Sequence, residues 1–462
     1  EIIPSFKPNI EKFEKLQFCN QRREFLKIRE QFKNLSVSQQ RKVSENLDST
    51  DENNPYTLLF NVISGLAPDI QKNIVGESVI RACNNELFIS PLDTNEGKKY
   101  TEYIDFKNLL LQYNESTALD LIDYFREIYP IKGTSHENIV FNNEGSSGLF
   151  EPLYDNFIKK KENNIFIQLK QYFPLTKTLT KNKETNPFAF SDFEELQHWI
   201  NYYYNTYNNF ENCKMVFVFV NPGNPHGPYI NHKEIHTLIK HYKNNEKILF
   251  IIDEAYADFC ERKYGYTNKE TADYFNGVIE NGNTILVRTL SKLYGLPNIR
   301  YGYAIGNNKL INNIQKDMST SFHPILEYIA KICFKKEVHQ SYLKEIIDPF
   351  LKNTEILKNK YNIELKKHNN NYTRIDDDNT PFATLALGKD FETTALKLFY
   401  EWGIITQPGS IGYENIVRIS LVNFEDRIKT PLLKRYIPRE YSQNINEYNF
   451  SAVSKILEKL NS

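Results

Sequence analysis

The chain has 462 residues, which is long enough for two domains with a large core. The charges of its 57 basic and 58 acidic residues nearly cancel. The net charge therefore does not indicate binding to nucleic acid or to an anionic membrane. Five cysteines without a CxxC or Cys/His cluster indicate neither a disulfide framework nor a metal site, and they favour a reducing, cytoplasmic compartment. The longest apolar runs, such as Met215–Val220 and Ile248–Ile252, are too short to span a bilayer and are typical of buried strands.

The N-terminal part of the chain is predicted to be helical, with a polar interruption. Residues 11–34 have the spacing of a charged amphipathic helix that lies on its own domain or on a partner subunit. Its apolar stripe consists of Phe13, Leu16, Phe25, Ile28 and Phe32. Residues 44–55 are polar and rich in turn formers, so we expect a loop there. A further helix, over residues 116–128, begins the larger domain.

From this helix onward, short apolar runs alternate with helical segments. The runs that we expect to form strands are Glu137–Asn142, Ile165–Leu169, Lys214–Val220, Ile248–Asp253, Thr284–Arg288 and Tyr301–Gly306. Helical patterns such as Asp192–Tyr204 and Lys233–Tyr242 separate several of them. Apolar runs joined by helices predict an α/β fold with a mostly parallel sheet covered on both faces. Such sheets bind ligands beyond the carboxyl ends of their strands.

The pattern changes after about residue 340. A helix over residues 341–360 precedes a smaller α+β region at 361–425, and a last helix is expected at 446–460. We therefore divide the chain into an N-terminal extension with part of the small domain (1–110), a large cofactor-binding domain (111–335) and a C-terminal small domain (336–462).

Three motifs follow predicted strands: NPGNPHG at 221–227, DEAY at 253–256 and TLSKLYGLPNIR at 289–300. Lys292 in the third motif has an amine that can form a Schiff base with an aldehyde. Asp253 ends a buried strand, where an acid can keep a pyridine ring protonated and electron-withdrawing. An acid that only caps the next helix is the alternative. Together the lysine and the acid predict chemistry on pyridoxal 5'-phosphate (PLP).

Candidate phosphate ligands accompany the lysine. Thr289 and Ser291 carry hydroxyls, and Arg300 can donate fork-like, charge-assisted hydrogen bonds to a phosphate dianion. Ser146 and Ser147 lie in a GSSG turn that follows a strand and begins a helix, so backbone amides there can complete the phosphate site. Considered alone, Arg300 is equally compatible with a surface ion pair, and Gly/Ser turns are common.

The cofactor ring has candidate contacts of its own. Tyr256 and the side-chain amide of Asn224 can reach the phenolic oxygen of the ring. Tyr172, with Phe173 as the alternate, is the candidate for the aromatic side chain that covers the ring face. The competing interpretations are an ordinary turn around Asn224 and a core role for Tyr172. The Asn224–Pro225 bond is a candidate cis peptide.

Arg418 is the candidate substrate-binding residue. It lies in the apolar run NIVRISLV, where an arginine needs an anionic partner or a path to water. A substrate carboxylate fits this requirement, because bidentate pairing fixes the orientation of the substrate. A structural ion pair is the alternative.

These motifs resemble those of the fold-type I PLP enzymes, the aspartate aminotransferase superfamily. Within it the chain is most similar to the class I/II branch that includes histidinol-phosphate aminotransferases. The family patterns NPxNPxG, DEAY and (S/T)xSKxxGLxxxR occur in order, with 29 residues from Asn224 to Asp253 and 39 from Asp253 to Lys292. The resemblance covers about residues 45–425 and is most specific from Asp253 to Arg300.

The resemblance implies the PLP-transferase fold, with a mostly parallel seven-stranded sheet between helices and a smaller α+β domain formed from both chain ends. It implies that Lys292 binds the cofactor as a Schiff base and later moves a proton, that Asp253 pairs with the pyridine nitrogen, and that Arg418 holds the substrate α-carboxylate. It also implies a homodimer with active sites at the subunit boundary and a small amino-acid substrate. We expect a biosynthetic aminotransferase of amino-acid metabolism.

The chain departs from the family in several places. His226 stands where a threonine is usual, and the tyrosine that crosses the dimer is not clearly aligned, with Tyr100 and Tyr103 as candidates. A PLP-dependent lyase, decarboxylase or cyclase is the alternative to an aminotransferase, and a non-catalytic regulator on the same scaffold is a third reading. The intact lysine, aspartate and arginine argue against the regulator.

Overall fold

The computed structural model describes the chain as two compact units. Unit 2 comprises residues 86–352 and 377–380, and unit 1 comprises 1–85, 353–376 and 381–462. The boundaries expected from the sequence, after residues 110 and 335, both lie inside unit 2 by this division. The residues that the structure describes are 18–44, 54–66, 68–76, 80–82, 90–101, 119–132, 136–160, 162–169, 171, 175, 178, 184–209, 214–225, 228–243, 245–318, 323–366, 372–374, 377–378, 380–387, 395–408 and 416–420.

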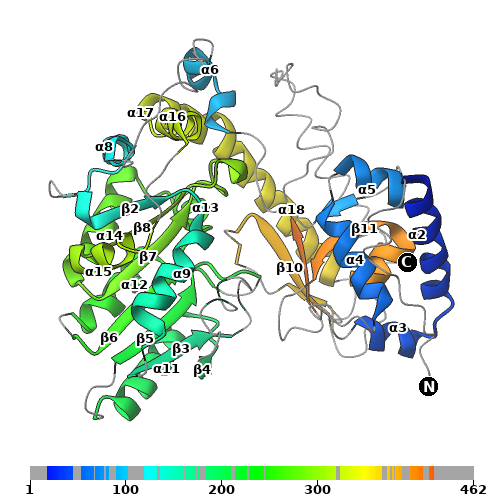
Figure 1. The fold of residues 1–462 in the computed structure, drawn as a ribbon, viewed down its shortest axis with the longest axis horizontal. Helices are drawn as coiled ribbons and strands as arrows, with labels where there is room; N and C mark the ends of the chain where they lie inside the picture. The colour runs from blue at the N-terminus through cyan, green and yellow to red at the C-terminus, as the bar shows by residue number, and fades with distance from the viewer. Residues whose placement is uncertain are drawn as a thin grey trace. The chain divides into compact units, whose positions relative to one another are not determined.

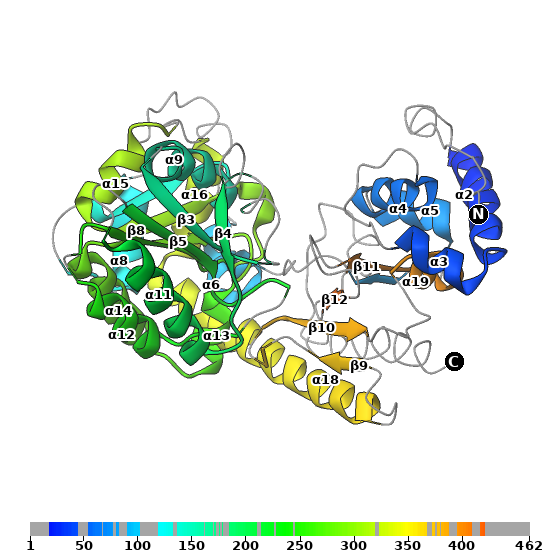
Figure 2. The same cartoon turned by 90° about the horizontal axis from the view of Figure 1, so that it is seen from below.

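Unit 2 is formed around a seven-stranded sheet (Figures 1 and 2). In spatial order its strands are β2 (Ile139–Asn142), β8 (Gly302–Gly306), β7 (Thr284–Thr289), β6 (Ile248–Asp253), β5 (Lys214–Val220), β3 (Asn163–Gln168) and β4 (Thr185–Phe188). From β7 to β4 all neighbouring strands are parallel, whereas β8 pairs antiparallel with both β7 and β2. The expected α/β fold with a mostly parallel sheet is therefore confirmed.

Six of these strands were expected from apolar runs, and β4 was not. β4 has the sequence TNPF and pairs with β3 at one edge of the sheet. Pro187 has no amide hydrogen to donate, and prolines are tolerated in strands mainly at such edges. A polar, proline-containing edge strand gives too weak a signal to be recognised from composition.

Helices cover both faces of the sheet. The first face packs against α9 (Phe150–Leu153), the helical turn η4 (Tyr154–Ile158) and α15 (Asn308–Gln315), which share a buried core with alternate strand residues. The second face packs against α11 (Phe193–Tyr207), α12 (His232–His241) and α14 (Asn268–Asn281), through aromatic contacts such as Phe166–Tyr203. Strand residues alternate between the two faces because the side-chain period of a strand is two.

The remaining helical segments of unit 2 connect or flank this sheet. They are η1 (Pro91–Asp93), α6 (Asn95–Thr101), α8 (Leu119–Ile128), η2 (His136–Asn138), η3 (Ser146–Leu149), α13 (Ala257–Lys263), η5 (Pro297–Ile299), α16 (Pro324–Cys333), α17 (Lys336–Tyr342) and η6 (Leu343–Ile347). The expected helix at 116–128 corresponds to α8. Helix α18 (Asp348–Lys366) begins in unit 2 and continues into unit 1.

Unit 1 combines the two chain ends in a five-stranded sheet and a group of helices. The strand order is β1 (Ile80–Ala82), β11 (Ile404–Pro408), β12 (Ile416–Ser420), β10 (Phe382–Leu387) and β9 (Tyr372–Arg374). The helices are α2 (Phe18–Lys33), α3 (Val37–Ser44), α4 (Pro55–Gly65), α5 (Pro68–Val75) and α19 (Ala395–Trp402). This arrangement confirms the expected α+β region formed from both ends of the sequence.

The N-terminal amphipathic helix corresponds to α2, and its stripe packs within unit 1. Phe25, Ile28 and Phe32 are fully buried in a cluster that includes residues of α4 and α19. The alternative of a helix lying on a partner subunit is not needed to bury them. Phe13, Leu16 and the expected helix at 446–460 lie outside the described residues, as do residues 45–53 of the loop expected at 44–55. At the two ends of that range, Ser44 ends α3 and Pro55 begins α4.

Candidate active site

Asp253 is a buried acid at the carboxyl end of the central strand β6. It is 2% exposed and stands in register with Val220 and Val287, whose side chains line the first face of the sheet. Its carboxylate accepts a hydrogen bond of 3.1 Å from the backbone amide of Ala255. Burial raises the pKa of Asp253 to about 7, although that hydrogen bond opposes the shift. The side chain is therefore positioned where a cationic partner would favour its ionised form.

Lys292 lies close to this acid. It follows β7, and its Nζ atom is 5.4 Å from the centroid of the Tyr256 ring. Its positive charge is also near enough to lower the pKa of Asp253 in part. The structure thus places Lys292, Tyr256 and Asp253 in one group at the carboxyl edge of the sheet.

Tyr294 and the loop after Lys292 are held by buried contacts to α17. The Tyr342 hydroxyl donates a hydrogen bond of 2.6 Å to the backbone oxygen of Leu293, and the Tyr294 hydroxyl lies 3.1 Å from Nδ1 of His339. The pKa of His339 is lowered to about 3, chiefly by burial, so its imidazole is neutral. These contacts fix the backbone that carries the lysine.

The hydroxyls proposed for phosphate binding are buried and mutually hydrogen-bonded. The Thr289 hydroxyl lies 3.0 Å from the Ser291 hydroxyl and donates to the backbone oxygen of Tyr301 at 3.1 Å. The backbone amide of Ser291 donates to the Thr289 hydroxyl at 3.1 Å. This tight turn directly precedes Lys292.

Arg300 joins this turn to the GSSG segment. Its Nη2 atom donates a hydrogen bond of 2.7 Å to the backbone oxygen of Glu144, and its own backbone oxygen accepts one of 2.7 Å from the amide of Gly145. Gly145 is the N-cap of η3, which begins with Ser146 and Ser147. The Arg300 guanidinium therefore lies beside the backbone of the GSSG segment. Phosphate binding by these residues stays a prediction.

Gly302 is a part of this site that the sequence analysis did not identify. It pairs with Asn142 of β2 and with Thr289 of β7, so it lies between the two strands that precede the candidate phosphate ligands. A Cβ atom at Gly302 would lie 2.3 Å from the carbonyl carbon of Gly145 and 2.4 Å from the amide nitrogen of Ser146. The backbones approach this closely because residue 302 has no side chain. In the sequence, this position could have been recognised as a glycine two residues after Arg300 of the third motif.

The NPGNPHG turn is held by side chains on both sides. Asn221 exchanges two hydrogen bonds of 2.8 Å with the backbone of Ile230. The buried side chain of Gln171 accepts a hydrogen bond of 2.7 Å from the backbone amide of Asn224. The Asn224–Pro225 bond is cis, as expected, and so is the Asn221–Pro222 bond. Asn224 is thereby fixed at the end of β5.

Gln171 was missed in the sequence analysis because an isolated glutamine in a loop carries no pattern. It directly precedes the candidate ring-covering residues in the sequence, and its side chain contacts the Asn224 turn. Tyr172 and Phe173 themselves lie outside the described residues, as does His226.

Arg418 and Tyr100 belong to other elements than the residues above. Arg418 lies on β12 of unit 1, in register with Thr384 and Gln407, and its guanidinium is 5.7 Å from the Phe382 ring centroid. Its role in substrate binding stays a prediction. Tyr100, on α6 of unit 2, donates a short hydrogen bond to Glu337; Tyr103 lies outside the described residues.

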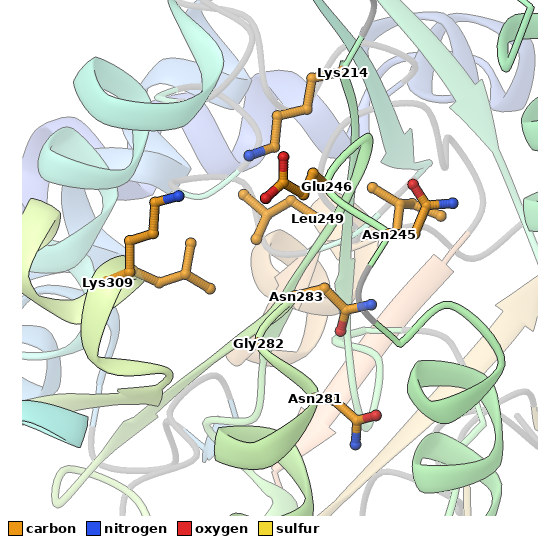
Figure 3. Close-up of a pocket in the computed structure, with 10 residues that line it drawn as sticks. Lys214, Asn245, Glu246, Leu249, Asn281, Gly282, Asn283 and Lys309 are labelled. Atoms are coloured by element: carbon orange, nitrogen blue, oxygen red, sulfur yellow. The ribbon is translucent and has the colours of Figure 1, made fainter.

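A separate hollow opens at the opposite edge of the sheet. It has a volume of about 330 Å³, and Lys214, Glu246 and Lys309 are among the residues that line it (Figure 3). Lys214 is the first residue of β5, whereas Asp253 and Thr289 are the last residues of their strands. The hollow is therefore distinct from the candidate active site.

The residues at the carboxyl edge fit PLP. A buried acid can pair with a protonated ring nitrogen, and a nearby lysine can form a Schiff base with an aldehyde. Backbone amides next to glycines, together with hydroxyls and an arginine, can bind a phosphate. Among the described residues, no group of His, Cys, Asp and Glu has the arrangement of a metal site. Within the same described ranges, none of the helices has the length and apolar character needed to cross a membrane.

The fold and this site define a PLP-dependent enzyme of fold type I. The chain belongs to the aminotransferase class I and II family, whose model matches residues 161–427. The match includes all three motifs and Arg418.

Curated relatives carry out more than one reaction. The dihydroxyacetone phosphate transaminase Cj1437c of Campylobacter jejuni is 28% identical over 53% of this chain and 58% of its own length. The L-serine phosphate decarboxylase Cj1436c of the same organism is 28% identical over 44% of this chain and 50% of its own length. The histidinol-phosphate aminotransferase of Caldicellulosiruptor saccharolyticus is 24% identical over 74% of this chain and 87% of its own length. In the first two alignments, the chain thus spans only about half of the relative.

Solved structures share the fold. The histidinol-phosphate aminotransferase of Clostridium acetobutylicum superposes with a TM-score of 0.58 at 17% identity, over 82% of this chain and 100% of that one. The histidinol-phosphate aminotransferase of Sinorhizobium meliloti, in complex with PLP, superposes with a TM-score of 0.56 at 18% identity. The match covers 85% of this chain and 95% of that one.

Proposed function

We propose that the protein is a PLP-dependent aminotransferase that acts on an amino acid or an amino-acid derivative. The observation that carries the PLP chemistry of this proposal is the grouping of Lys292, Tyr256 and the buried Asp253 at the carboxyl edge of the sheet. Membership of the aminotransferase class I and II family favours amino transfer as the reaction. Bound PLP would supply an electron-withdrawing ring that stabilises negative charge on the substrate Cα.

Each residue of the site has a part in this proposal. Lys292 would hold the cofactor covalently and, once displaced by the substrate amine, would carry a proton to and from Cα. Ionised Asp253 would keep the proton on the ring nitrogen, and Tyr256 and Asn224 would bind the ring oxygen. The residues that would bind the phosphate are Ser146, Ser147, Thr289, Ser291 and Arg300. Arg418 would orient the substrate carboxylate, and Tyr172 would stack on the ring.

We further propose that the substrate carries a phosphate monoester. The relatives support this proposal, because they include a dihydroxyacetone phosphate transaminase, an L-serine phosphate decarboxylase and a histidinol-phosphate aminotransferase. A phosphorylated substrate would need an anion site in addition to the one for the cofactor phosphate.

A PLP-dependent decarboxylase, within the wider alternative of a lyase or cyclase, is the second candidate function. The decarboxylase Cj1436c is as identical to this chain as the transaminase Cj1437c, at 28% each. Both reactions begin from the same bound substrate and differ in which bond to Cα is broken. That choice depends on the orientation of the substrate, so the residues described above are compatible with either reaction.

The two reactions are separated by their products. The PLP-loaded protein is incubated with L-amino acids and with their O-phosphorylated forms, and the cofactor spectrum, 2-oxo acid and carbon dioxide are followed. Conversion of the cofactor to pyridoxamine 5'-phosphate with an equal amount of 2-oxo acid supports an aminotransferase. Carbon dioxide with a spectrum that returns to its starting form supports the decarboxylase. Absence of both products across the panel would contradict the proposed reaction classes.

A homodimer and a cytoplasmic location remain predictions of the family resemblance and the cysteine content. The family implies that active sites lie at the subunit boundary, and a partner residue would then complete the site.

A further inference from the structure

A buried ionic cluster lies directly behind the candidate active site. Arg288, which is fully buried, donates to Glu254 at 2.7 and 2.9 Å, to Asp258 at 3.2 Å and to Glu261 at 3.1 Å. His232 lies 2.6 Å from the other oxygen of Glu261. All four partners are at most 7% exposed. Charges are seldom buried to this extent unless they are paired and hydrogen-bonded, so the cluster needs an explanation.

The cluster lies on the second face of the sheet, opposite the side chain of Asp253. Val287 belongs to the core of the first face, and Asp253 is in register with it. Arg288 follows Val287, and Glu254 follows Asp253, so both turn to the other face, where Arg288 stacks 4.7 Å from the ring of Phe275 on α14. The ionic cluster and the side chain of Asp253 therefore lie on opposite faces of the sheet.

Arg288 nevertheless joins the two chain segments that form the active site. Its three carboxylate partners lie between residues 254 and 261, the segment that follows Asp253 and contains Tyr256. Arg288 itself is one residue before Thr289 and four before Lys292. A single guanidinium thus holds the acid-bearing segment against the lysine-bearing strand, with the fork geometry that fixes both distance and direction.

Arg288 also neutralises the acid next to Asp253. The charge of Glu254 is one of the causes that raise the pKa of Asp253. Glu254 receives two hydrogen bonds from Arg288 and a third, of 2.6 Å, from the Tyr274 hydroxyl. Without the arginine, Glu254 would keep only the Tyr274 hydrogen bond, and its charge, no longer offset by a cation, would disfavour the ionised Asp253 that the ring nitrogen requires.

We propose that Arg288 is a positioning residue of the cofactor site, which sets the spacing between Asp253 and Lys292. This inference rests on the proposed function. A purely structural role would also explain the burial of Arg288, but it predicts a loss of stability without a specific loss of cofactor binding.

The test compares PLP affinity and thermal unfolding for Arg288→Lys and a matched control. Arg262→Lys is the control, because Arg262 lies on α13 and makes a bidentate pair with Asp348 at 2.6 and 2.7 Å, outside the cluster. Arg288→Lys keeps the positive charge but loses the planar guanidinium, whose several N–H donors bind the carboxylates at the same time. We expect its PLP affinity to fall roughly 10- to 100-fold, the effect of removing residues that orient the ligands of metal sites. Arg262→Lys should bind PLP as the unmodified protein does.

A double-variant cycle tests the neutralising role with a spectroscopic readout. At saturating PLP, Arg288→Met should change the visible spectrum of the bound cofactor, and adding Glu254→Gln should restore it in part. If Arg288→Met does not fold, the Arg288→Lys comparison alone decides. Unchanged PLP affinity in Arg288→Lys, with a lowered melting temperature, would overturn the inference. Failure of the unmodified protein to bind PLP would instead overturn the proposed function on which it rests.

Discussion

Asp253 is the residue on which the proposed chemistry depends most. An apolar strand that ends in an acid was enough to predict a buried carboxylate, and the structure confirms the burial. The pKa of Asp253 could not be predicted from the sequence. It depends on burial, on the amide of Ala255 and on the charges of Glu254 and Lys292, which the fold brings near the carboxylate. Without the cofactor, an acid with a pKa of about 7 is only partly ionised near neutral pH.

Replacing Asp253 with Asn should change how stability depends on pH. Because the pKa is raised by folding, the contribution of Asp253 to apo-protein stability is present below its unfolded pKa of 3.8 and is lost as the pH rises through about 7. The loss at pH 8 is up to about 4 kcal/mol, from a shift of about three units. Asp253→Asn should therefore unfold like the unmodified apo-protein at pH 4 and be more stable at pH 8. Denaturant unfolding across this range measures the difference, and a difference independent of pH would contradict the assignment.

At the level of elements, three strands meet at the proposed phosphate site. β8 lies between β2 and β7, and Gly302 stands in register with the last residue of each. The motifs predicted that the turns after neighbouring strands share one edge of the sheet, and the parallel strands β5, β6 and β7 end there. The antiparallel direction of β8 and the close contact at Gly302 arise from strand pairing, which apolar runs do not specify.

A Gly302→Ala substitution should damage the phosphate site. The new methyl group would meet the backbone of Gly145 and Ser146 at 2.3–2.5 Å, so both segments must move. We expect weaker PLP binding and a loss of stability of roughly 1–3 kcal/mol, typical of overpacking. Gly306→Ala is the control on the same strand, because its nearest contact would be 3.0 Å from the Thr284 oxygen. Equal effects of the two substitutions on PLP titrations would argue against this role of Gly302.

Other elements show where sequence patterns are insufficient. The strand TILVRT was expected as a buried run that contains an arginine, but nothing near it in the sequence identifies the three acids that pair with Arg288. Those acids lie 27 to 34 positions earlier, on α13 and the turn before it. Long-range ion pairs of this kind depend on the packing of helices on the sheet.

For the whole molecule, the sequence predicted the class of fold, whereas the three domain ranges stay a prediction. The parallel sheet follows from alternating strands and helices, and the use of both chain ends in unit 1 follows from the family resemblance. The limits of the units depend on which loops pack against which sheet, and those loops have little pattern. The reaction class is likewise decided by substrate orientation, which the motifs do not encode.

The homodimer is tested on the intact protein. Sedimentation equilibrium should give a mass of twice 54.4 kDa, the mass of one chain. A monomer that binds PLP and is active would contradict the prediction that a partner subunit completes the site.

The most direct test of the central claim is to trap the cofactor on its lysine. The PLP-loaded protein is reduced with borohydride, digested and mapped by mass spectrometry, with Lys292→Ala as the comparison. We predict one pyridoxyl-modified peptide that contains Lys292, and its loss in the variant. Lys214, the partly buried lysine at the opposite edge of the sheet, should stay unmodified. Modification of another lysine instead, or an equal yield of modified protein from Lys292→Ala, would contradict the account.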